Sequence, residues 1–343
     1  MDNSTNFTNR LNWIDWAKVI AITLVVYGHI PQERGSFGVN YVVQFHMPFF
    51  FFISGYLTKK EIFGSAIIKK YCRTLIIPYF TYNLIFYPFW LVRYFYENSN
   101  PIISDLIKPI IGTFMLQQVT TISLPLYGVT WFIAALFLMK FILSVSHLYK
   151  HGHLAIIFLS SACAIAYVYN EFYRIVIDLT PVGIMKCLPF FILGYYSKLK
   201  GHLPTKHISN DFLMGFCCLT LSIIIYFFFR EYRGLSTYGF FFWTICLSAI
   251  WGIFSICRLL DNIHNKMIVN ISTGTIVIMG LHGMVITMCN FLFAKLLGTE
   301  KGITYPWFIA ILLSLAFVIA LYPLIILFKN KVPFMLGKSN SAS

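Results

Sequence analysis

Long apolar segments recur along almost the whole chain, separated by short polar or basic stretches. A helix needs about 17–25 mostly apolar residues to cross a bilayer. The pattern predicts ten spanning helices, near residues 16–30, 39–58, 76–96, 129–147, 153–170, 181–198, 211–229, 237–257, 270–295 and 305–328. We therefore expect an all-α polytopic membrane protein with one membrane-embedded domain over residues 1–343. Short polar tails are expected at residues 1–12 and 330–343.

The segment 62–75 has a different pattern, because apolar and basic residues alternate in it at helical spacing. Such a segment is typical of an amphipathic helix that lies in the membrane interface. We expect one here, before the third spanning helix.

Composition supports the membrane assignment. Of the 343 residues, 58% are hydrophobic and 11% charged, whereas soluble domains carry about 25% charged residues. The formal net charge of +14 would suggest nucleic acid in a soluble protein. In a membrane protein, basic loops fix the topology and contact anionic head groups. We expect membrane lipids and no nucleic acid as partners.

The basic residues of the loops predict the orientation, because cytoplasmic loops carry an excess of lysine and arginine. One side would hold Arg10, Lys59, Lys60, Lys69, Lys70, Arg73, Lys150, Lys198, Lys200, Lys206, Arg258, Lys266, Lys329, Lys331 and Lys338. The other would hold Arg34, Lys108, Arg174, Arg230, Arg233 and Lys301. The richer side includes both termini, which we therefore place in the cytoplasm.

Two ionisable residues in the first apolar segment are the first candidates for chemistry. Lys18 and His29 are eleven residues apart, which is roughly 16 Å along a helix axis. The orientation places Lys18 near the cytoplasmic end and His29 near the outer end. An imidazole can take a proton from a sugar hydroxyl, or it can hold two helices together. Lys18 could contact a phosphate or the amides of a pantetheine arm, or extend to the inner head groups.

A basic pair follows at the predicted cytoplasmic surface. Lys70 and Arg73 are three residues apart, so they would share a face of a helix. Two cations on one face would suit the phosphates of coenzyme A. The alternative is an anchor on anionic lipid.

Two further histidines lie in spanning segments. His46 precedes Pro48 and could line the same outer cavity as His29, or bond a carbonyl that the proline frees. The small pair Ser54-Gly55 in the same segment would let helices approach closely. His282, between Gly280 and Gly283, could line a pore or be a packed core residue.

The sequence gives little indication of a metal-binding site. His147, His151 and His153 lie in a basic loop without a nearby carboxylate or cysteine. The eight cysteines are scattered and form no Cys-x-x-Cys pair. We therefore expect neither a metal site nor a disulfide framework.

Taken together, these residues resemble acyltransferase family 3, the membrane-bound sugar O-acyltransferases, and within it the fucose 4-O-acetylase-like branch. The resemblance is carried by Trp13-Ile-Asp15-Trp-Ala-Lys18 with His29, Phe45 to Leu57, Lys70 to Tyr79, Thr130-Trp131-Phe132, Pro189 to Gly194 and Gly274 to His282. Lysine replaces the more usual arginine at positions 18 and 70, which keeps the charge but loses bidentate geometry. The stretch that ends at His282 is less polar than is usual in the family.

The resemblance implies transfer of an acyl group, expected to be acetyl, from acyl-CoA to a hydroxyl of a sugar. The sugar would belong to a surface polysaccharide or its lipid-linked precursor, and the protein to the bacterial cytoplasmic (inner) membrane. His29 would be catalytic, and Lys18, Lys70 and Arg73 would bind acetyl-CoA. His46, Trp131 and His282 would bind the carbohydrate acceptor, without a metal.

The reaction course stays open, since direct transfer and a covalent relay are both compatible with these residues. A transporter or flippase for a lipid-linked sugar is the alternative function. A polysaccharide polymerase or glycosyltransferase is a third possibility, although the longest outer loop, about 97–128, holds few carboxylates.

Overall fold

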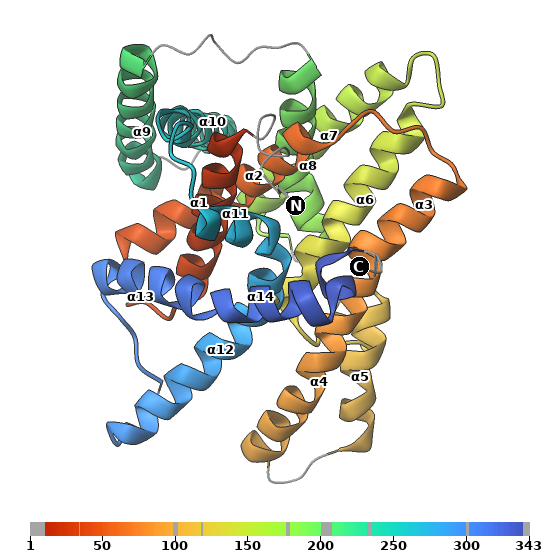
Figure 1. Ribbon diagram of the computed structural model, residues 1–343, viewed down its shortest axis with the longest axis vertical. Helices are drawn as coiled ribbons and strands as arrows, with labels where there is room; N and C mark the ends of the chain where they lie inside the picture. The colour runs from red at the N-terminus through yellow and green to blue at the C-terminus, as the bar shows by residue number, and fades with distance from the viewer. Residues whose placement is uncertain are drawn as a thin grey trace, which may run out of the picture.

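The computed structural model describes residues 11–33, 35–98, 102–117, 119–175, 179–199, 208–231, 235–299 and 302–338. Within these ranges the regular structure is helical, apart from an isolated bridge between Gln32 and Tyr305. The elements are α1 (Asn12–His29), α2 (Phe37–Leu57), α3 (Ser65–Tyr71), η2 (Cys72–Ile76), α4 (Ile77–Glu97), α5 (Ile103–Phe114), η3 (Gly128–Thr130), α6 (Trp131–Ser146), α7 (Gly152–Tyr173), α8 (Leu179–Leu199), α9 (Ile208–Glu231), α10 (Leu235–Leu259), α11 (Lys266–Thr273), α12 (Thr275–Leu296), α13 (Trp307–Ala320), α14 (Tyr322–Lys331) and η4 (Pro333–Leu336) (Figure 1). The all-α prediction is confirmed.

Seven helical segments in the described ranges are long and apolar enough to cross a membrane. They are Ser65–Glu97, Gly128–Ser146, Gly152–Tyr173, Asn210–Phe228, Tyr238–Leu259, Thr275–Leu296 and Trp307–Lys331. The protein is therefore a polytopic membrane protein. Three more predicted spans correspond to α1, α2 and α8, which carry Lys18, His46 and Lys186 among their apolar residues. The count of ten stays a prediction.

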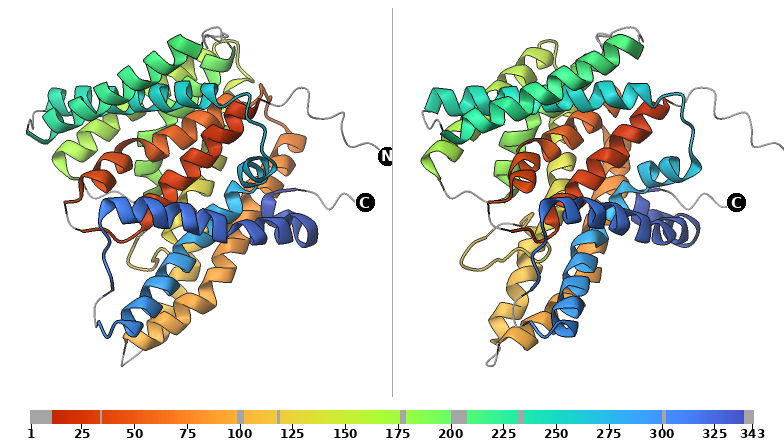
Figure 2. Two further views of the ribbon diagram at one scale, coloured as in Figure 1. Left: turned by 60° about the vertical axis from the view of Figure 1, so that its left-hand side comes forward. Right: turned by 90° about the vertical axis from the view of Figure 1, so that its left-hand side faces the viewer.

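The helices α1, α2 and α8 lie at the centre of the molecule (Figure 1). The neighbouring helices α9 and α10 run side by side next to them, and α6 and α7 contact α8. Helices α4, α5 and α12 extend away from this centre (Figure 2). The start of α1 and the segment η4 lie toward the same side of the molecule (Figure 2). Which side faces the cytoplasm stays a prediction from the basic residues.

A close crossing joins α2 to α8. A Cβ atom added at Gly55 would lie 1.9 Å from the carbonyl oxygen of Phe191, and one added at Gly194 would lie 2.1 Å from that of Phe52. Each helix therefore uses a glycine where the other's backbone passes, as small residues permit in membranes. The close approach predicted from Ser54-Gly55 is confirmed.

The predicted interfacial helix over residues 62–75 is not a separate element. Helix begins at Ser65 and continues without a break through the π-helical turn η2 into α4. Pro78 has no N–H to give to the Thr74 carbonyl, as an α-helix would require. The wider turn directly before it takes up this change of register. The amphipathic stretch thus begins one continuous helical segment, Ser65–Glu97.

Two predicted single helices are divided in the structure. The predicted span 270–295 is replaced by α11 and α12, which meet at Gly274, where an added Cβ would lie 2.3 Å from Ile325. The break therefore allows α14 to pack closely against this point. The predicted span 305–328 divides into α13 and α14 at Leu321. Pro323 lies in the first turn of α14, where a missing N–H costs least.

Candidate active site

His29 is the last residue of α1, and its side chain is exposed. Its Nδ1 atom lies 2.8 Å from the carbonyl oxygen of Val25. Because a carbonyl only accepts hydrogen bonds, Nδ1 carries the hydrogen, and Nε2 of the neutral ring keeps its lone pair. The helix therefore fixes the tautomer and leaves Nε2 as the basic nitrogen of an exposed residue at its end.

His282 of α12 lies beside His29. The two ring centroids are 4.8 Å apart, and the ring planes meet at 82°. His282 is 0% exposed. Its Nδ1 donates to the Ile278 carbonyl at 2.8 Å, while its Nε2 is buried without a hydrogen-bond partner in the described part of the chain. A second basic nitrogen is thus buried at the same place.

His46 of α2 lies beside the last turn of α1. A Cβ atom added at Gly28 would lie 3.8 Å from Nε2 of His46, so the glycine before His29 leaves room for this ring. Its Nδ1 donates to Val42 at 3.0 Å. The structure therefore brings the three predicted histidines together.

The carbonyl that Pro48 frees has another partner. Pro48 cannot donate to the Gln44 carbonyl, and that oxygen accepts the thiol of Cys246 on α10 at 3.4 Å. Neighbouring helices often satisfy such groups in membranes. His46 is therefore not needed to satisfy the Gln44 carbonyl. Its hydrogen bond to the Val42 carbonyl fixes the tautomer of its own ring.

In the first half of α1, Lys18 contacts α11. Its ammonium donates to the carbonyl of Ser272, whose hydroxyl donates to Asp15 at 2.5 Å. Asp15 is buried, so this polar group lies between helices rather than among head groups. The α11–α12 segment consequently contacts α1 at two places, through Ser272 at Lys18 and through His282 at His29.

Trp131 is the first residue of α6, which corresponds to the predicted span 129–147. Its half-buried ring packs against α8, where a Cβ atom at Gly183 would lie 2.0 Å from Cζ3, and its centroid is 6.1 Å from that of Phe51. Tyr127, in the loop before Trp131, lies next to the histidines. A Cβ atom added at Gly283, the residue after His282, would lie 2.9 Å from the Tyr127 hydroxyl.

Sequence reasoning missed the buried amide network that holds this loop. The Gln117 amide donates to Asn83 at 2.9 Å and to Thr130 at 3.2 Å, and its oxygen accepts the backbone N–H of Tyr127 at 3.3 Å. Gln117 is 0% exposed and has a φ of 66°, a conformation that non-glycine residues rarely adopt. The signal available was Asn83, an amide within an otherwise apolar and aromatic helix.

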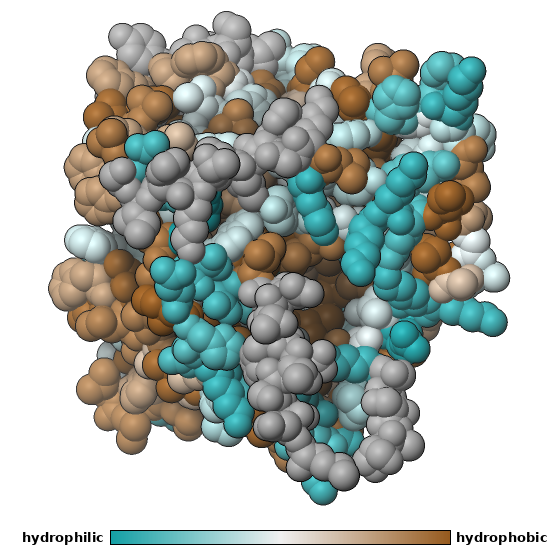
Figure 3. All heavy atoms as spheres, turned by 45° about the horizontal axis from the view of Figure 1, so that its top comes forward, coloured by the Kyte–Doolittle hydropathy of each residue, from teal (hydrophilic) through white to brown (hydrophobic). Residues whose placement is uncertain are grey.

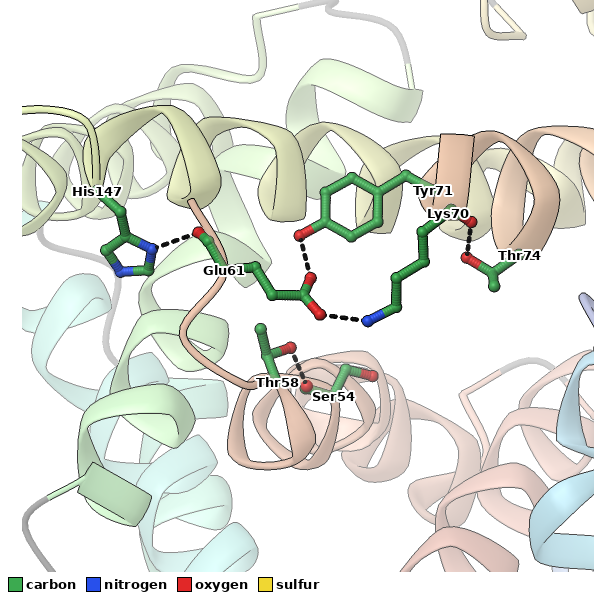
Figure 4. A network of polar contacts seen from close by, with 7 residues as sticks. All are labelled: Ser54, Thr58, Glu61, Lys70, Tyr71, Thr74 and His147. Atoms are coloured by element: carbon green, nitrogen blue, oxygen red, sulfur yellow. Dashed lines mark hydrogen bonds and ion pairs between the residues drawn. The ribbon is translucent and has the colours of Figure 1, made fainter. Parts of the chain in front are cut away.

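Of the predicted donor-binding pair, Lys70 lies in the last turn of α3 and Arg73 in η2. Lys70 forms an ion pair with Glu61, whose other oxygen accepts the Tyr71 hydroxyl at 2.8 Å (Figure 4). Arg73 is exposed in η2. The helix changes to a π turn at Cys72, between the two residues, and the common face of Lys70 and Arg73 stays a prediction.

Glu61 is the common partner of Lys70, Tyr71 and His147 (Figure 4). Burial raises the pKa of its carboxyl, but hydrogen bonds from Lys70 and Tyr71 outweigh burial, and the pKa lies below its usual value. His147 donates to the Glu61 carbonyl oxygen at 2.8 Å and accepts from Tyr195 at 3.0 Å. Both ring nitrogens of His147 thus have protein partners.

Besides Lys70, another cation lies near Glu61 that was not predicted from the sequence. Lys140 of α6 lies 5.9 Å from the centre of the Tyr71 ring, beside the residues that hold Glu61.

Figure 3 shows one face of the molecule, on which hydrophilic side chains form bands around a recessed hydrophobic area.

Comparison with known proteins supports a family assignment that covers nearly the whole chain. The nodulation protein NolL of Mesorhizobium japonicum is 28% identical over 200 residues, which cover 54% of this chain and 48% of NolL. The chain thus spans about half the length of the curated relative it matches. No solved structure matches. The family model described as an acyltransferase domain matches residues 11–325, and the chain therefore belongs to acyltransferase family 3.

Proposed function

We propose that the protein transfers an acetyl group from acetyl-CoA to a hydroxyl of a sugar in a surface polysaccharide or its lipid-linked precursor. Membership of the acyltransferase family supports the reaction type. The resemblance to the fucose 4-O-acetylase-like branch supports a sugar acceptor, and the apolar helices support an integral membrane location. The proposal places the protein in a bacterial cytoplasmic membrane with both termini inside.

The observation that carries the proposal is the exposed His29 ring with its fixed tautomer. Nε2 takes the proton of the sugar hydroxyl while the hydroxyl oxygen attacks the thioester carbonyl carbon. The new C–O bond forms and the C–S bond breaks. The coenzyme A thiolate then takes the proton from His29, so that the products are the O-acetyl sugar and free coenzyme A.

The donor is proposed to lie along α1. Lys70 and Arg73 bind its phosphates, since both are exposed cations on one short segment. Lys18 guides the uncharged pantetheine arm, whose extended length is comparable to the roughly 16 Å between Lys18 and His29. The charged nucleotide then remains at the surface, where its burial costs least.

The acceptor is proposed to bind at the other end of α1. His46 and His282 each present Nε2 beside His29, and Trp131 opens α6 with a half-buried indole. Imidazole nitrogens can accept sugar hydroxyls. No metal takes part in this scheme.

Incubation of membranes with labelled acetyl-CoA, followed by counting of label in glycan, tests the proposal. A general base contributes about 10²–10⁴-fold, so His29→Ala should lose most of the incorporation. The control is His153→Ala, which removes an exposed histidine of α7. Equal labelling by wild type and His29→Ala, at equal amounts of inserted protein, would remove His29 from the mechanism.

A further inference from the structure

Lys186 of α8 is a half-buried cation that the proposed mechanism leaves unused. Its ammonium donates to the carbonyl oxygen of Val43 on α2 at 3.0 Å. It also lies 5.8 Å from the centre of the Tyr167 ring and 5.6 Å from that of Phe242. Two aromatic faces and one carbonyl therefore hold this charge inside the helix bundle.

The ammonium has no carboxylate partner among the residues that the structure describes. It has three N–H donors, and the Val43 carbonyl accepts one of them. Ionisable residues inside spanning helices are costly, and they generally pair with an opposite charge or face a pathway. A cation held by rings and one neutral oxygen has capacity left for an anion.

The position of Lys186 links it to the histidines. The Val43 carbonyl belongs to the turn of α2 that precedes His46. A Cβ atom added at Gly28 would lie 3.9 Å from the side chain of Val43 and 3.8 Å from Nε2 of His46. Gly28 directly precedes His29, so Val43 contacts Lys186 through its carbonyl oxygen and lies beside the residue before the proposed base through its side chain.

We propose that Lys186 binds an acidic group on the acceptor, either a phosphate of a lipid carrier or a carboxylate of the sugar itself. The inference rests on the proposed function, since it assigns a chemical class to the acceptor. The predicted orientation places the first turns of α8 and the histidines toward the same outer side. The donor phosphates have Lys70 and Arg73 at the opposite side, so Lys186 is available for a second anion.

Thermal unfolding of the purified protein with paired probes tests the proposal. The pairs are farnesyl diphosphate against farnesol, and octyl glucuronide against octyl glucoside. A ligand of the native state raises its stability in proportion to RT ln(1 + [L]/Kd). In the wild type, one anionic probe should raise the melting temperature more than its neutral counterpart, and the pair that responds identifies the source of the charge.

Lys186→Met should abolish this difference, whereas Lys186→Arg should retain it. Lys295→Met is the matched control, because Lys295 also lies near two rings, Tyr96 and Phe291, but is exposed. A difference that survives in Lys186→Met would overturn the proposal, as would equal effects of charged and neutral probes on the wild type.

The same measurement separates this inference from the proposed function. His29→Ala should retain the preference for the anionic probe, because binding requires no transfer. If the preference depends on Lys186 while His29→Ala also transfers acetyl groups normally, the anion site stands and the mechanism fails. If His29→Ala is inactive but no preference exists in the wild type, the mechanism stands and the anion site fails.

Discussion

Replacement of Glu61 by glutamine should tighten the binding of coenzyme A. In the free protein Lys70 is paired with Glu61, and the two side chains are 47% and 13% exposed. If Lys70 binds a phosphate of the donor, the phosphate competes with this carboxylate for the ammonium. Glutamine removes the competing charge but keeps an oxygen that can accept the Tyr71 hydroxyl.

The expected gain follows from the exposure of the pair. Partly exposed ion pairs contribute about 0.2–1 kcal/mol. Since about 1.4 kcal/mol corresponds to tenfold in affinity, the Kd of coenzyme A should fall by about 1.4- to 5-fold. Calorimetric titration of purified protein measures this change. Lys70→Met should shift the Kd in the opposite direction.

The control variant is Glu97→Gln, which breaks the exposed Arg93–Glu97 pair and changes the net charge by the same amount. Its Kd should equal that of the wild type. An unchanged or weakened affinity in Glu61→Gln would refute the assignment of Lys70 to the donor phosphates. Equal gains in both variants would mean that net charge alone explains the effect.

The gain should not vary between pH 5.5 and 8. The pKa of Glu61 is lowered below its usual value of 4.5, because hydrogen bonds from Lys70 and Tyr71 outweigh burial. A group with a lowered folded-state pKa contributes stability above its unfolded pKa and loses it as the pH falls through the folded value. Glu61 therefore stays charged over this range. A gain that changes with pH would point to another titrating group.

Two further substitutions test the acceptor end and the helix crossing. His282→Phe keeps a ring beside His29 but removes the Nε2 acceptor, together with the Nδ1 donor to the Ile278 carbonyl, so the KM for the acceptor should rise by about 2–10-fold; an unchanged KM would exclude His282 from binding. Gly194→Val places a side chain against the Phe52 carbonyl and should cost about 1–3 kcal/mol or more. Its melting temperature should fall, whereas that of Gly64→Ala, with open space around the Cβ position, should not.

Much of the fold could be predicted from the sequence, because apolar length is a direct consequence of bilayer thickness. The helical class and the glycine crossing at Gly55 followed from local composition. The breaks at Gly274 and Leu321 did not, because both depend on which helix packs against the segment. Likewise, nothing local to Ser65–Ile76 distinguishes an interfacial helix from the start of a continuous span.

The candidate site, like the fold, could be predicted from the sequence only in part. His29, His46 and His282 are visible as rare ionisable residues in apolar segments, and the structure places them together. Lys186 is equally visible in the sequence, but its meaning depends on its distance from α2. Gln117 carries no sequence signal at all, since its role comes from an unusual backbone conformation in a loop.

The end of α1 decides which of the three histidines is exposed. All three rings donate from Nδ1 to the carbonyl four residues earlier, so all three present Nε2 in the same tautomer. His46 is 8% and His282 0% exposed, whereas His29 is exposed. The residue before a proline is forced out of the helical region, and Ile30, which precedes Pro31, is extended with ψ at 130°. Pro31 therefore ends the helix directly after His29, and this placement makes His29 the most exposed of the three histidines.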